Sequence, residues 1–522
     1  MKTKRFFFAA LAIFAALVSC TPEEQPADNG DDNGKENGNN TPGETKSSEC
    51  KLTAFVVTID GKEVEVFIDQ TDKTIELSYL PLQFEALKTA TAEVTISEKA
   101  TISPDPAEPH DYTSEGGVEY TVTAEDGTTN NVYTVYAAPA DIRNTTEMKW
   151  SKTYDQMGLA ASRSNMCGVG FVDRGHFATS DFNVYDLNGT KVGTLNTTGI
   201  PGFDHYNGQL GAMSNDVNGI LVAFAEYTSP DATNGDGVLT ETWAWLDGYD
   251  KAPTLIYGPF DYPCNYMSVS GDVKGDFILT FRTGAQAGPQ MHHVIVFKNG
   301  QYFNGEGGSA GTWNAVYIPH PGNDGCWGQL LSFFSGDPND GFICWDSMGA
   351  AEHEDWDYND DGTVKVDQYG NPTGNASSAY YYYSSLSGAQ SGAIEEVPLY
   401  GGVTWANWDS QGKYYNYGNF STGHVRAFIY NGDKCIIACS GSWPCTWITV
   451  QKADNLVEDD PDTDEIDESE SNYLLPTDRI NDASQCYPCC AYVFDPAAGI
   501  GHIIYLSQSA YVLAYDLSTS II

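Results

Sequence analysis

The sequence predicts an all-β protein with an amino-terminal sandwich and a carboxyl-terminal β-propeller. Short runs of alternating apolar and polar side chains recur in the first part of the chain, which is typical of half-buried strands. Asp-Gly and Asn-Gly pairs follow several of these runs and favour tight turns. After residue 140 the chain is rich in Gly, Tyr, Asn and Asp and has little helical periodicity. These three observations favour strands in both domains.

Residues 1–20 resemble the signal peptide of a bacterial lipoprotein. Three cations precede an apolar run over residues 6–18, which is too short to span a bilayer as a helix. The run ends in Leu17-Val18-Ser19-Cys20, which resembles a lipobox. The resemblance implies that residues 1–19 are removed and that Cys20 carries the lipid. The alternative is an ordinary secretory peptide that contains a cysteine by chance.

The residues after Cys20 predict a surface-exposed tether. Glu23 and Glu24 resemble the acidic export signal of Bacteroidetes lipoproteins, which directs them to the outer face of the outer membrane. Residues 20–49 contain almost no apolar side chains, so they cannot bury enough surface to offset chain entropy. We therefore expect a disordered tether that anchors the protein to the membrane through its lipid alone.

Composition limits the partners of this chain. The 26 Lys and Arg residues face 71 Asp and Glu residues, for a formal net charge of −45. Nucleic acid is excluded because a phosphate-backbone binder needs clustered cations. Such acidity instead favours solubility and affinity for divalent cations. The chain has 12 cysteines without neighbouring histidines, which favours buried thiols or one or two disulfides over zinc.

Residues 50–139 predict an immunoglobulin-like sandwich. About seven short strands fall within this segment, with Asp60-Gly61 and Asp126-Gly127 as turns. The segments 100–104 and 120–128, with Tyr133-Thr134-Val135 after them, resemble the amino-terminal sandwich of a family of Bacteroidetes surface lipoproteins of unknown function. The resemblance implies a surface location, this sandwich and a carboxyl-terminal propeller-like domain. It implies no chemistry and only a weak link to glycans.

Residues 140–522 predict a β-propeller because two sequence markers repeat. Asp216 and Asp272 stand 56 residues apart in similar segments, and Asp247 and Asn299 stand 52 apart in a second pair. A period near 50 is typical of propeller blades. It predicts about seven blades, with six or eight as alternatives, and a large double sandwich as the competing fold. The likeness of residues 514–517 to 184–187 predicts closure of the ring.

Two insertions interrupt the predicted blades, near 353–373 and 457–471. The second is a run of acids and is expected to be a solvated disordered loop, with calcium binding as the alternative. The first contains Asp355, Asp357, Asn359 and Asp361, followed by Gly362. Alternating oxygen ligands before a glycine resemble half of a calcium loop. These four residues are the candidate calcium ligands, with an Asp/Asn/Gly turn cluster that needs no metal as the alternative.

Aromatic residues provide the candidate ligand-binding site. Trp405, Trp408, Tyr415 and Tyr417 cluster in one segment. Flat aromatic faces bind sugar rings, and the loop face of a propeller is a suitable concave place for them. The alternative is that these side chains pack between strands.

The sequence contains no H-E-x-x-H, G-x-S-x-G or P-loop motif, although propeller enzymes can assemble catalytic residues from dispersed positions. Binding is favoured because the tether and the sandwich would lift a binding face away from the lipid. We therefore expect an outer-membrane surface lipoprotein that binds an extracellular ligand, foremost a neutral glycan, for nutrient capture. An outer-membrane transporter is its candidate partner. The alternatives are a polysaccharide hydrolase or lyase on a propeller scaffold, and a protein-binding adhesion or assembly module.

Overall fold

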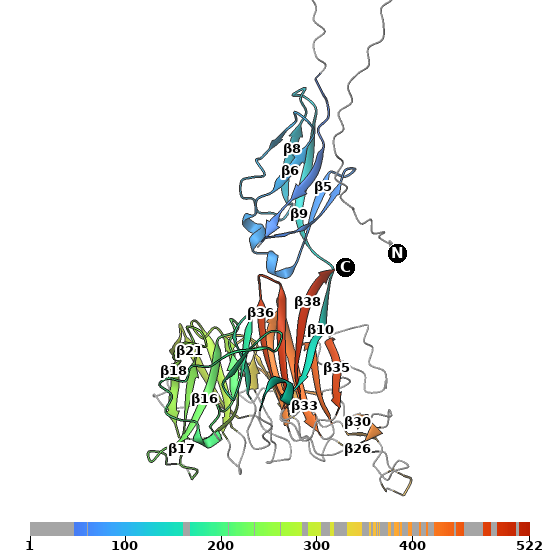
Figure 1. The fold of residues 1–522 in the computed structure, drawn as a ribbon. Coiled ribbons are helices and arrows are strands. Elements are labelled where there is room, and N and C mark those ends of the chain that lie inside the picture. The colour runs from blue at the N-terminus through green and yellow to red at the C-terminus, as the bar shows by residue number, and fades with distance from the viewer. Residues whose placement is uncertain are drawn as a thin grey trace, which may run out of the picture.

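The computed structural model is all-β, as predicted (Figure 1). It describes residues 46–522 except for 60, 160–167, 207, 234, 262, 284–290, 304–313, 318–330, 347–353, 357–358, 362, 364, 366–373, 377–379, 386, 389–394, 399–406, 409–413, 416–421, 443–444, 454–472, 482–487 and 508–510. The candidate lipidation residue Cys20 and residues 20–45 of the predicted tether therefore lie outside the described residues. The last residues of that segment, 46–49, are described, and there the Ser47 N–H donates to Glu125 of the sandwich at 3.0 Å. Within the described part of the chain, no helix is long and apolar enough to cross a membrane.

The first domain is a sandwich whose sheets share one apolar core. Its elements are β1 (Leu52–Val56), β2 (Thr58–Ile59), β3 (Lys62–Glu63), β4 (Glu65–Asp69), β5 (Thr74–Tyr79), η1 (Pro81–Gln83), η2 (Ala86–Thr89), β6 (Glu93–Ile96), β7 (Thr101–Ser103), β8 (Val118–Thr123) and β9 (Asn130–Pro139). One sheet has the order β4-β5-β9-β8-β7, with β5 and β9 parallel, and β1 pairs with β6. Phe55 of β1 packs in the same core as Leu77 and Tyr133 of the larger sheet. The immunoglobulin-like topology stays a prediction.

The second domain consists of consecutive four-stranded antiparallel sheets. The first sheet is β11 (Val169–Asp173), β12 (His176–Thr179), β13 (Asn183–Asp186) and β14 (Lys191–Thr194). The second is β15 (Met213–Asn215), β16 (Leu221–Thr228), β17 (Val238–Ala244) and β18 (Thr254–Phe260). The third is β19 (Cys264–Gly271), β20 (Phe277–Thr283), β21 (Met291–Lys298) and β22 (Gln301–Tyr302), with β23 (Asn314–Tyr317) also paired to β21. The α1 turn (Tyr154–Met157) precedes the first sheet, and η3 (Asp204–Tyr206) follows it.

The next two sheets are β24 (Leu331–Phe333), β25 (Phe342–Asp346), β28 (Tyr380–Ser384) and β29 (Glu395–Pro398); and β32 (Thr422–Tyr430), β33 (Asp433–Ser442), β34 (Cys445–Lys452) and β35 (Tyr473–Asn481). Two hairpins stand outside the sheets: β26 (Glu354–Trp356) with β27 (Gly374–Ala376), and β30 (Asn407–Trp408) with β31 (Tyr414–Tyr415). The last sheet is β36 (Pro488–Asp495), β37 (Ile500–Ser507), β38 (Tyr511–Ile521) and β10 (Ile142–Thr153).

The first strand of each sheet contacts the first strand of the next, which makes a ring. The contacts run from β11 to β15, β19, β24, β32 and β36, and β36 returns to β11. The described residues therefore form a six-bladed propeller, which lies within the predicted range of six to eight. The estimate of seven was too high because a 50-residue period also counted the two hairpins and the long connections as blades.

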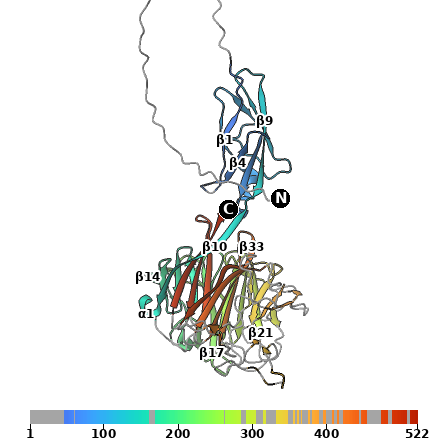
Figure 2. The same cartoon turned by 90° about the vertical axis from the view of Figure 1, so that its right-hand side faces the viewer.

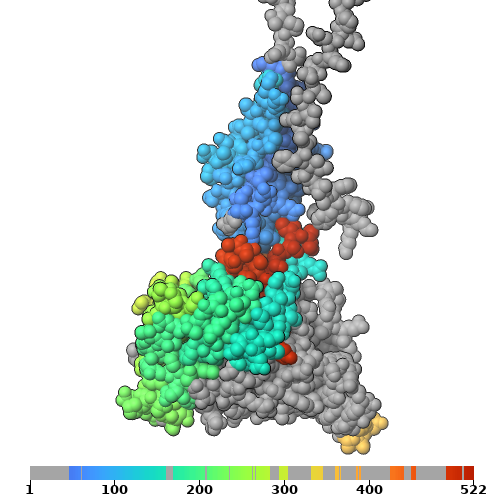
Figure 3. Space-filling model, viewed as in Figure 1, coloured from blue at the N-terminus to red at the C-terminus, as the bar shows by residue number. Residues whose placement is uncertain are grey.

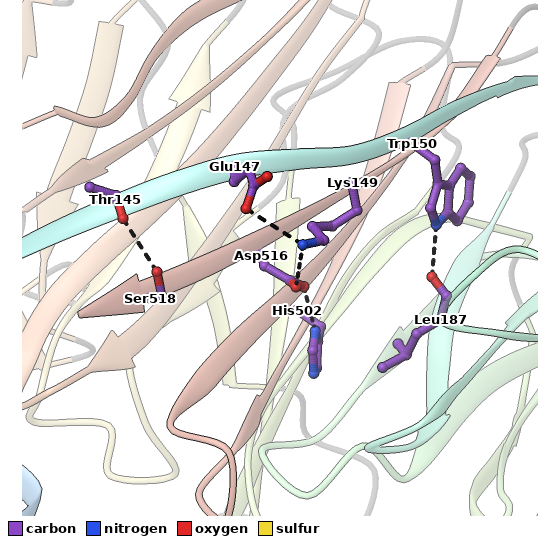
Figure 4. Close-up of polar contacts among 8 residues, drawn as sticks. All are labelled: Thr145, Glu147, Lys149, Trp150, Leu187, His502, Asp516 and Ser518. Atoms are coloured by element: carbon purple, nitrogen blue, oxygen red, sulfur yellow. Dashed lines mark hydrogen bonds and ion pairs between the residues drawn. The ribbon is translucent and has the colours of Figure 1, made fainter. Parts of the chain in front are cut away.

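The ring is closed by strands from the two ends of the propeller, as the repeat predicted. β10 is the outer strand of the last blade and pairs with β38 along its whole length. Figure 4 shows the side chains that hold this pair. Lys149 of β10 lies 3.8 Å from Asp516 of β38, and Asp516 accepts from His502 at 2.7 Å. Trp150 donates to the carbonyl oxygen of Leu187 at 2.7 Å and thereby joins the closing blade to the first blade.

The repeated aspartates occupy equivalent turns in successive blades. The Asp216 carboxylate accepts the backbone N–H of Asn218 at 2.8 Å, and the Asp272 carboxylate accepts that of Lys274 at 2.9 Å. Each of these turns connects the first and second strands of its blade. Asp247 and Asn299 both follow the third strand of a blade. The periodicity in the sequence therefore reports the blade repeat.

The sandwich stands at one end of the propeller, which we call the proximal face; the opposite end is the distal face (Figures 1 and 2). Lys62 of the sandwich donates to the carbonyl oxygen of Ala498, in the β36–β37 turn, at 2.7 Å. Arg174 of the β11–β12 turn donates to the Phe494 carbonyl oxygen and to Asn218 of the β15–β16 turn. These three turns therefore share the proximal face.

Both residues between β9 and β10 are held by hydrogen bonds. The Ala140 N–H donates to the Tyr79 carbonyl oxygen in the sandwich at 2.9 Å, and the Asp141 carbonyl oxygen accepts from Ile522 at 2.9 Å. Figure 3 shows the sandwich projecting from the propeller at this junction. The distal face therefore points away from the sandwich.

Candidate functional site

A buried arginine crosses the axis of the propeller. Arg426 lies on β32, the inner strand of the fifth blade, and its guanidinium donates to the Ser214 hydroxyl and to the carbonyl oxygen of Asn215. Both acceptors lie on β15, the inner strand of the second blade, directly opposite in a ring of six. Arg426 is 5% exposed. Its side chain therefore fills the centre of the ring at this level, where propellers of this kind can otherwise hold a channel.

Asn215 extends this polar cluster to two more blades. Its amide oxygen accepts the backbone N–H of Phe171, on the first blade, at 3.2 Å. Its amide nitrogen donates to the carbonyl oxygen of Tyr492, on the sixth blade, at 2.8 Å. Asn215 is fully buried, so these contacts replace its hydrogen bonds with water.

Two serines join the remaining inner strands. Ser214 accepts the N–H of Val269 on the third blade at 3.2 Å. Ser332 on the fourth blade lies 2.9 Å from the Ser268 hydroxyl of the third and accepts the N–H of Ala427 on the fifth at 3.0 Å. We call Arg426, Ser214, Asn215, Ser268 and Ser332 the axial cluster. Its hydrogen bonds reach the inner strands of all six blades.

The groups beside the axial cluster carry shifted pKa values. Burial lowers the pKa of Arg426, although Cys490 and Asp216 nearby favour its charged form. Burial also raises the pKa of Asp216, against three backbone N–H donors. His424 Nδ1 lies 3.2 Å from the Cys490 sulfur. Burial opposes ionisation of Cys490, but a hydrogen bond with Cys439 and the nearby His424 and Arg426 outweigh it and lower the pKa of this thiol.

The axial cluster was not predicted from the sequence. Arg426 is a lone cation in an apolar strand, between Val425 and Ala427, and this is the one signal that the sequence offers. A buried charge of this kind needs specific partners, but one sequence cannot name partners more than 200 residues away. Because the cluster is buried and its hydrogen bonds are made within the protein, its evident role is to hold the ring and to block the axis.

The candidate aromatic residues are only partly described. Trp405 and Tyr417 lie outside the described residues. Trp408 and Tyr415 lie on the β30–β31 hairpin, where Trp408 pairs with Tyr414 and Tyr415 pairs with Asn407. Figure 1 shows this hairpin and β26 at the distal end of the propeller. The predicted site residues that are described therefore lie at the end away from the sandwich.

The candidate calcium loop follows β26. Asp355 lies on that strand, and Asp357 lies outside the described residues. The Asp361 carboxylate accepts both the N–H and the hydroxyl of Thr363, at 3.0 and 2.6 Å, and the pKa of Asp361 is lowered by these bonds. Asn359 donates to the Thr363 hydroxyl at 3.0 Å. These contacts match the alternative of a polar turn, and calcium binding stays a prediction. Among the described residues, no group of three or more His, Cys, Asp or Glu could hold a metal.

Ionisable and aromatic groups also gather at the second blade, in a segment without a recognisable motif. Glu241 accepts from the Tyr227 hydroxyl at 3.1 Å and from the Trp243 indole at 3.0 Å. On the neighbouring strand, Glu226 accepts the N–H of Cys264 at 2.8 Å and lies 3.5 Å from His205 Nε2. Both carboxylates are buried, so these contacts support the fold of the blade.

The sandwich is similar to a known family of domains. The family described as "SGBP, N-terminal", the amino-terminal domain of surface glycan-binding proteins, matches residues 52–137. This match covers the sandwich and leaves the propeller outside it, so the similarity to surface glycan-binding proteins is shown for the first domain alone. No curated protein matches the chain.

Similar solved structures include proteins with propeller folds. A DUF4623 family protein from Bacteroides eggerthii is 11% identical with a TM-score of 0.40, covering 90% of this chain and 99% of that one. The Dos1 propeller is 9% identical with a TM-score of 0.27, covering 65% and 74%. A subtype N10 neuraminidase-like protein of A/little yellow-shouldered bat/Guatemala/060/2010 is 7% identical with a TM-score of 0.33, covering 72% and 100%. Because these TM-scores are low, the assignment of a propeller fold rests on the strand order and the ring of inner strands in this structure.

Proposed function

We propose that this protein is an outer-membrane surface lipoprotein that binds a neutral glycan at the distal face of its propeller, for nutrient capture. The match of residues 52–137 to the amino-terminal domain of surface glycan-binding proteins carries this proposal. Lipidation at Cys20 would anchor the chain, and the tether and sandwich would raise the propeller from the lipid. An outer-membrane transporter is the proposed partner that receives the glycan.

Three structural features support the distal face as the binding surface. Arg426 fills the axis, so a glycan chain could not thread through the ring at that level. The proximal face is joined to the sandwich through Lys62 and the strand β10, whereas the distal face points away from it. The β30–β31 hairpin brings Trp408 and Tyr415 to the distal end. Aromatic side chains at an open face are suited to the apolar C–H surfaces of sugar rings.

Affinity electrophoresis of the full chain tests this function. The gels contain one neutral polysaccharide each: β-glucan, glucomannan, arabinoxylan or amylopectin. We expect retardation in at least one gel, and at least tenfold weaker binding for Trp408→Ala. The control is Val217→Ala, which removes a 52% exposed side chain from the proximal face and should bind like the parent. Absence of retardation in every gel would contradict glycan binding.

The same polysaccharides separate binding from catalysis. Incubation with the full chain should leave their chain length unchanged. Release of reducing ends would support the hydrolase alternative, and release of unsaturated products would support the lyase alternative. Capture of an outer-membrane protein by a chain that binds no polysaccharide would support the assembly alternative.

A further inference from the structure

The sandwich carries an exposed row of side chains across three of its strands. Phe67 of β4 is directly opposite Glu76 of β5, and Glu76 is directly opposite Tyr136 of β9. Opposed residues of paired strands point to the same face of a sheet. Their neighbours Ile75, Leu77 and Val135 point to the core and are fully buried. The row therefore lies on the outer face of the five-stranded sheet.

The row is exposed to solvent, and hydrogen bonds fix the orientation of Glu76 and Tyr136. Phe67 is 66% exposed, the highest value among the large apolar side chains that the structure describes. The Tyr136 hydroxyl donates to Glu76 Oε2 at 3.2 Å, and the Ser78 hydroxyl donates to Glu76 Oε1 at 3.3 Å. Burial, and then Glu76, raise the pKa of Tyr136, so its hydroxyl stays protonated as a donor. The Glu76 side chain follows Phe67 and precedes Tyr136 in the row, and each of its carboxylate oxygens keeps a lone pair that a ligand could use.

Glycine keeps one side of the row uncovered. Gly117 lies beside Tyr136 with a φ of +71°, and a Cβ there would stand 2.4 Å from the Val135 carbonyl oxygen and 3.1 Å from the Tyr136 Cβ. A side chain is therefore excluded on both steric and backbone grounds. Figure 1 shows the sandwich projecting clear of the propeller, so the other domain does not cover this sheet.

The surroundings of the row favour a neutral polyhydroxylated ligand. The other strand residues that the register places on this face are mainly hydroxyls and acids, none is basic, and Val132 is the one large apolar side chain: Glu65, Asp69, Thr74, Ser78, Thr101, Ser103, Glu119, Thr121, Thr123, Asn130, Val132, Thr134 and Ala138. Acidic polymers and anionic lipids would be repelled. The two rings are separated by a carboxylate, whereas a protein partner usually covers a more continuous apolar core. Strands are spaced by about 4.8 Å, so Phe67 and Tyr136 lie about 10 Å apart, a span that linked sugar rings can bridge.

We propose that Phe67, Glu76 and Tyr136 form a second glycan-binding site, on the sandwich. The rings would pack against C–H faces of two sugars, and Glu76 would accept hydrogen bonds from hydroxyls between them. This inference deepens the proposed function and rests on it. It gives the sandwich a binding role in addition to its role as a spacer. Two linked sites on one chain would raise the avidity for a polymer above that of either site.

Affinity electrophoresis and titration of the full chain test the second site, with the polysaccharide that retards the parent chain. We expect Phe67→Ala to weaken binding by about fivefold, in line with the loss of one aromatic contact. Tyr136→Phe keeps the ring and frees Glu76, and a smaller loss is expected. Phe67→Ala combined with Trp408→Ala should weaken binding more than either change alone. Leu82→Ala removes a 54% exposed side chain elsewhere on the sandwich and should have no effect.

The outcomes separate this inference from the proposed function. If Trp408→Ala weakens binding but Phe67→Ala does not, the second site is overturned and the propeller site stands. If Phe67→Ala weakens binding but Trp408→Ala does not, the sandwich is the binding domain and the propeller site falls. Failure of the parent chain to bind any neutral polysaccharide would overturn both. Loss of a dimer by Phe67→Ala in sedimentation, without loss of glycan binding, would show that a second copy covers the row instead.

Discussion

Arg426 and Asn215 lie on opposite blades of the propeller, and the Arg426 guanidinium donates to the Asn215 carbonyl oxygen across the axis. This bond joins strands more than 200 residues apart in the sequence. The same asparagine bonds to the first and sixth blades. The centre of the ring is therefore held by polar contacts, and a ligand must approach from a face.

We predict that Arg426→Ala destabilises the propeller. The change leaves the Asn215 carbonyl oxygen and the Ser214 hydroxyl without their charged donor, at a cost of about 2–4 kcal/mol. Thermal unfolding followed by circular dichroism should show a clearly lower midpoint. Arg174→Ala is the matched control because Arg174 also joins blades, but at the exposed proximal face. A larger loss for Arg174→Ala would contradict the importance of the axial cluster.

We predict that β38 is needed to close the ring. Deletion of residues 511–522 removes the partner of both β10 and β37 and leaves two strand edges open. We expect this chain to aggregate or to lose its cooperative unfolding transition. Deletion of residue 522 alone removes one hydrogen bond, to Asp141, and should leave the transition intact. A soluble, cooperatively folding 511–522 deletion would show that the ring is stable without closure.

We predict that His293 makes stability fall between pH 6.5 and pH 4. Burial lowers the pKa of His293 from 6.5 to about 4, and its ring stacks on Phe281 with centroids 4.9 Å apart. Within this window the unfolded chain binds a proton that the folded chain does not, so folding loses stability as the pH falls. The full effect is about 3 kcal/mol.

His293→Phe tests this assignment because it keeps a flat ring beside Phe281 and removes the titration. The variant and the parent should be compared by denaturant unfolding at several values between pH 7 and pH 4. We expect the variant to gain stability relative to the parent as the pH falls. A constant difference across the range would exclude His293 as the source.

The sequence predicted the parts of this fold that depend on local pattern. Asp216 and Asp272 revealed the blade repeat because each builds the same turn from its own neighbours. The strands of the sandwich were visible because alternation reports one buried face. The number of blades was less well defined because hairpins such as β30–β31 lie between strands of the ring without belonging to it.

The axial cluster and the row on the sandwich were harder to predict because their contacts are not local in the sequence. Arg426 and Ser214 are separated by 212 residues, and only the closed ring brings them together. Phe67 and Tyr136 are both aromatic residues in strands, but the parallel pairing of β5 with β9 is what places them in one row. The lipid anchor at Cys20 and the aromatic residues Trp405 and Tyr417 stay predictions, since they lie outside the described residues.

We predict that Cys490 is a buried thiolate at neutral pH. The hydrogen bond with Cys439 and the neighbouring His424 and Arg426 outweigh burial and lower the Cys490 pKa, whereas burial raises the pKa of Cys439. Ultraviolet absorbance should therefore show one thiolate in the folded chain at pH 7. Cys490→Ala should remove this signal. Cys264→Ala is the control, because burial raises the pKa of Cys264 and its thiol should stay protonated.

The same ionisation should make stability depend on pH. Because the folded pKa of Cys490 lies below its unfolded value of about 8.5, the folded chain releases a proton that the unfolded chain keeps. The stabilisation is complete above the unfolded pKa and is lost as the pH falls toward the folded value. Cys490→Ala should therefore cost more stability at pH 8 than at pH 6 in denaturant unfolding. Equal losses at both values, with the absorbance unchanged, would show that Cys490 is a neutral thiol packed between the last two blades.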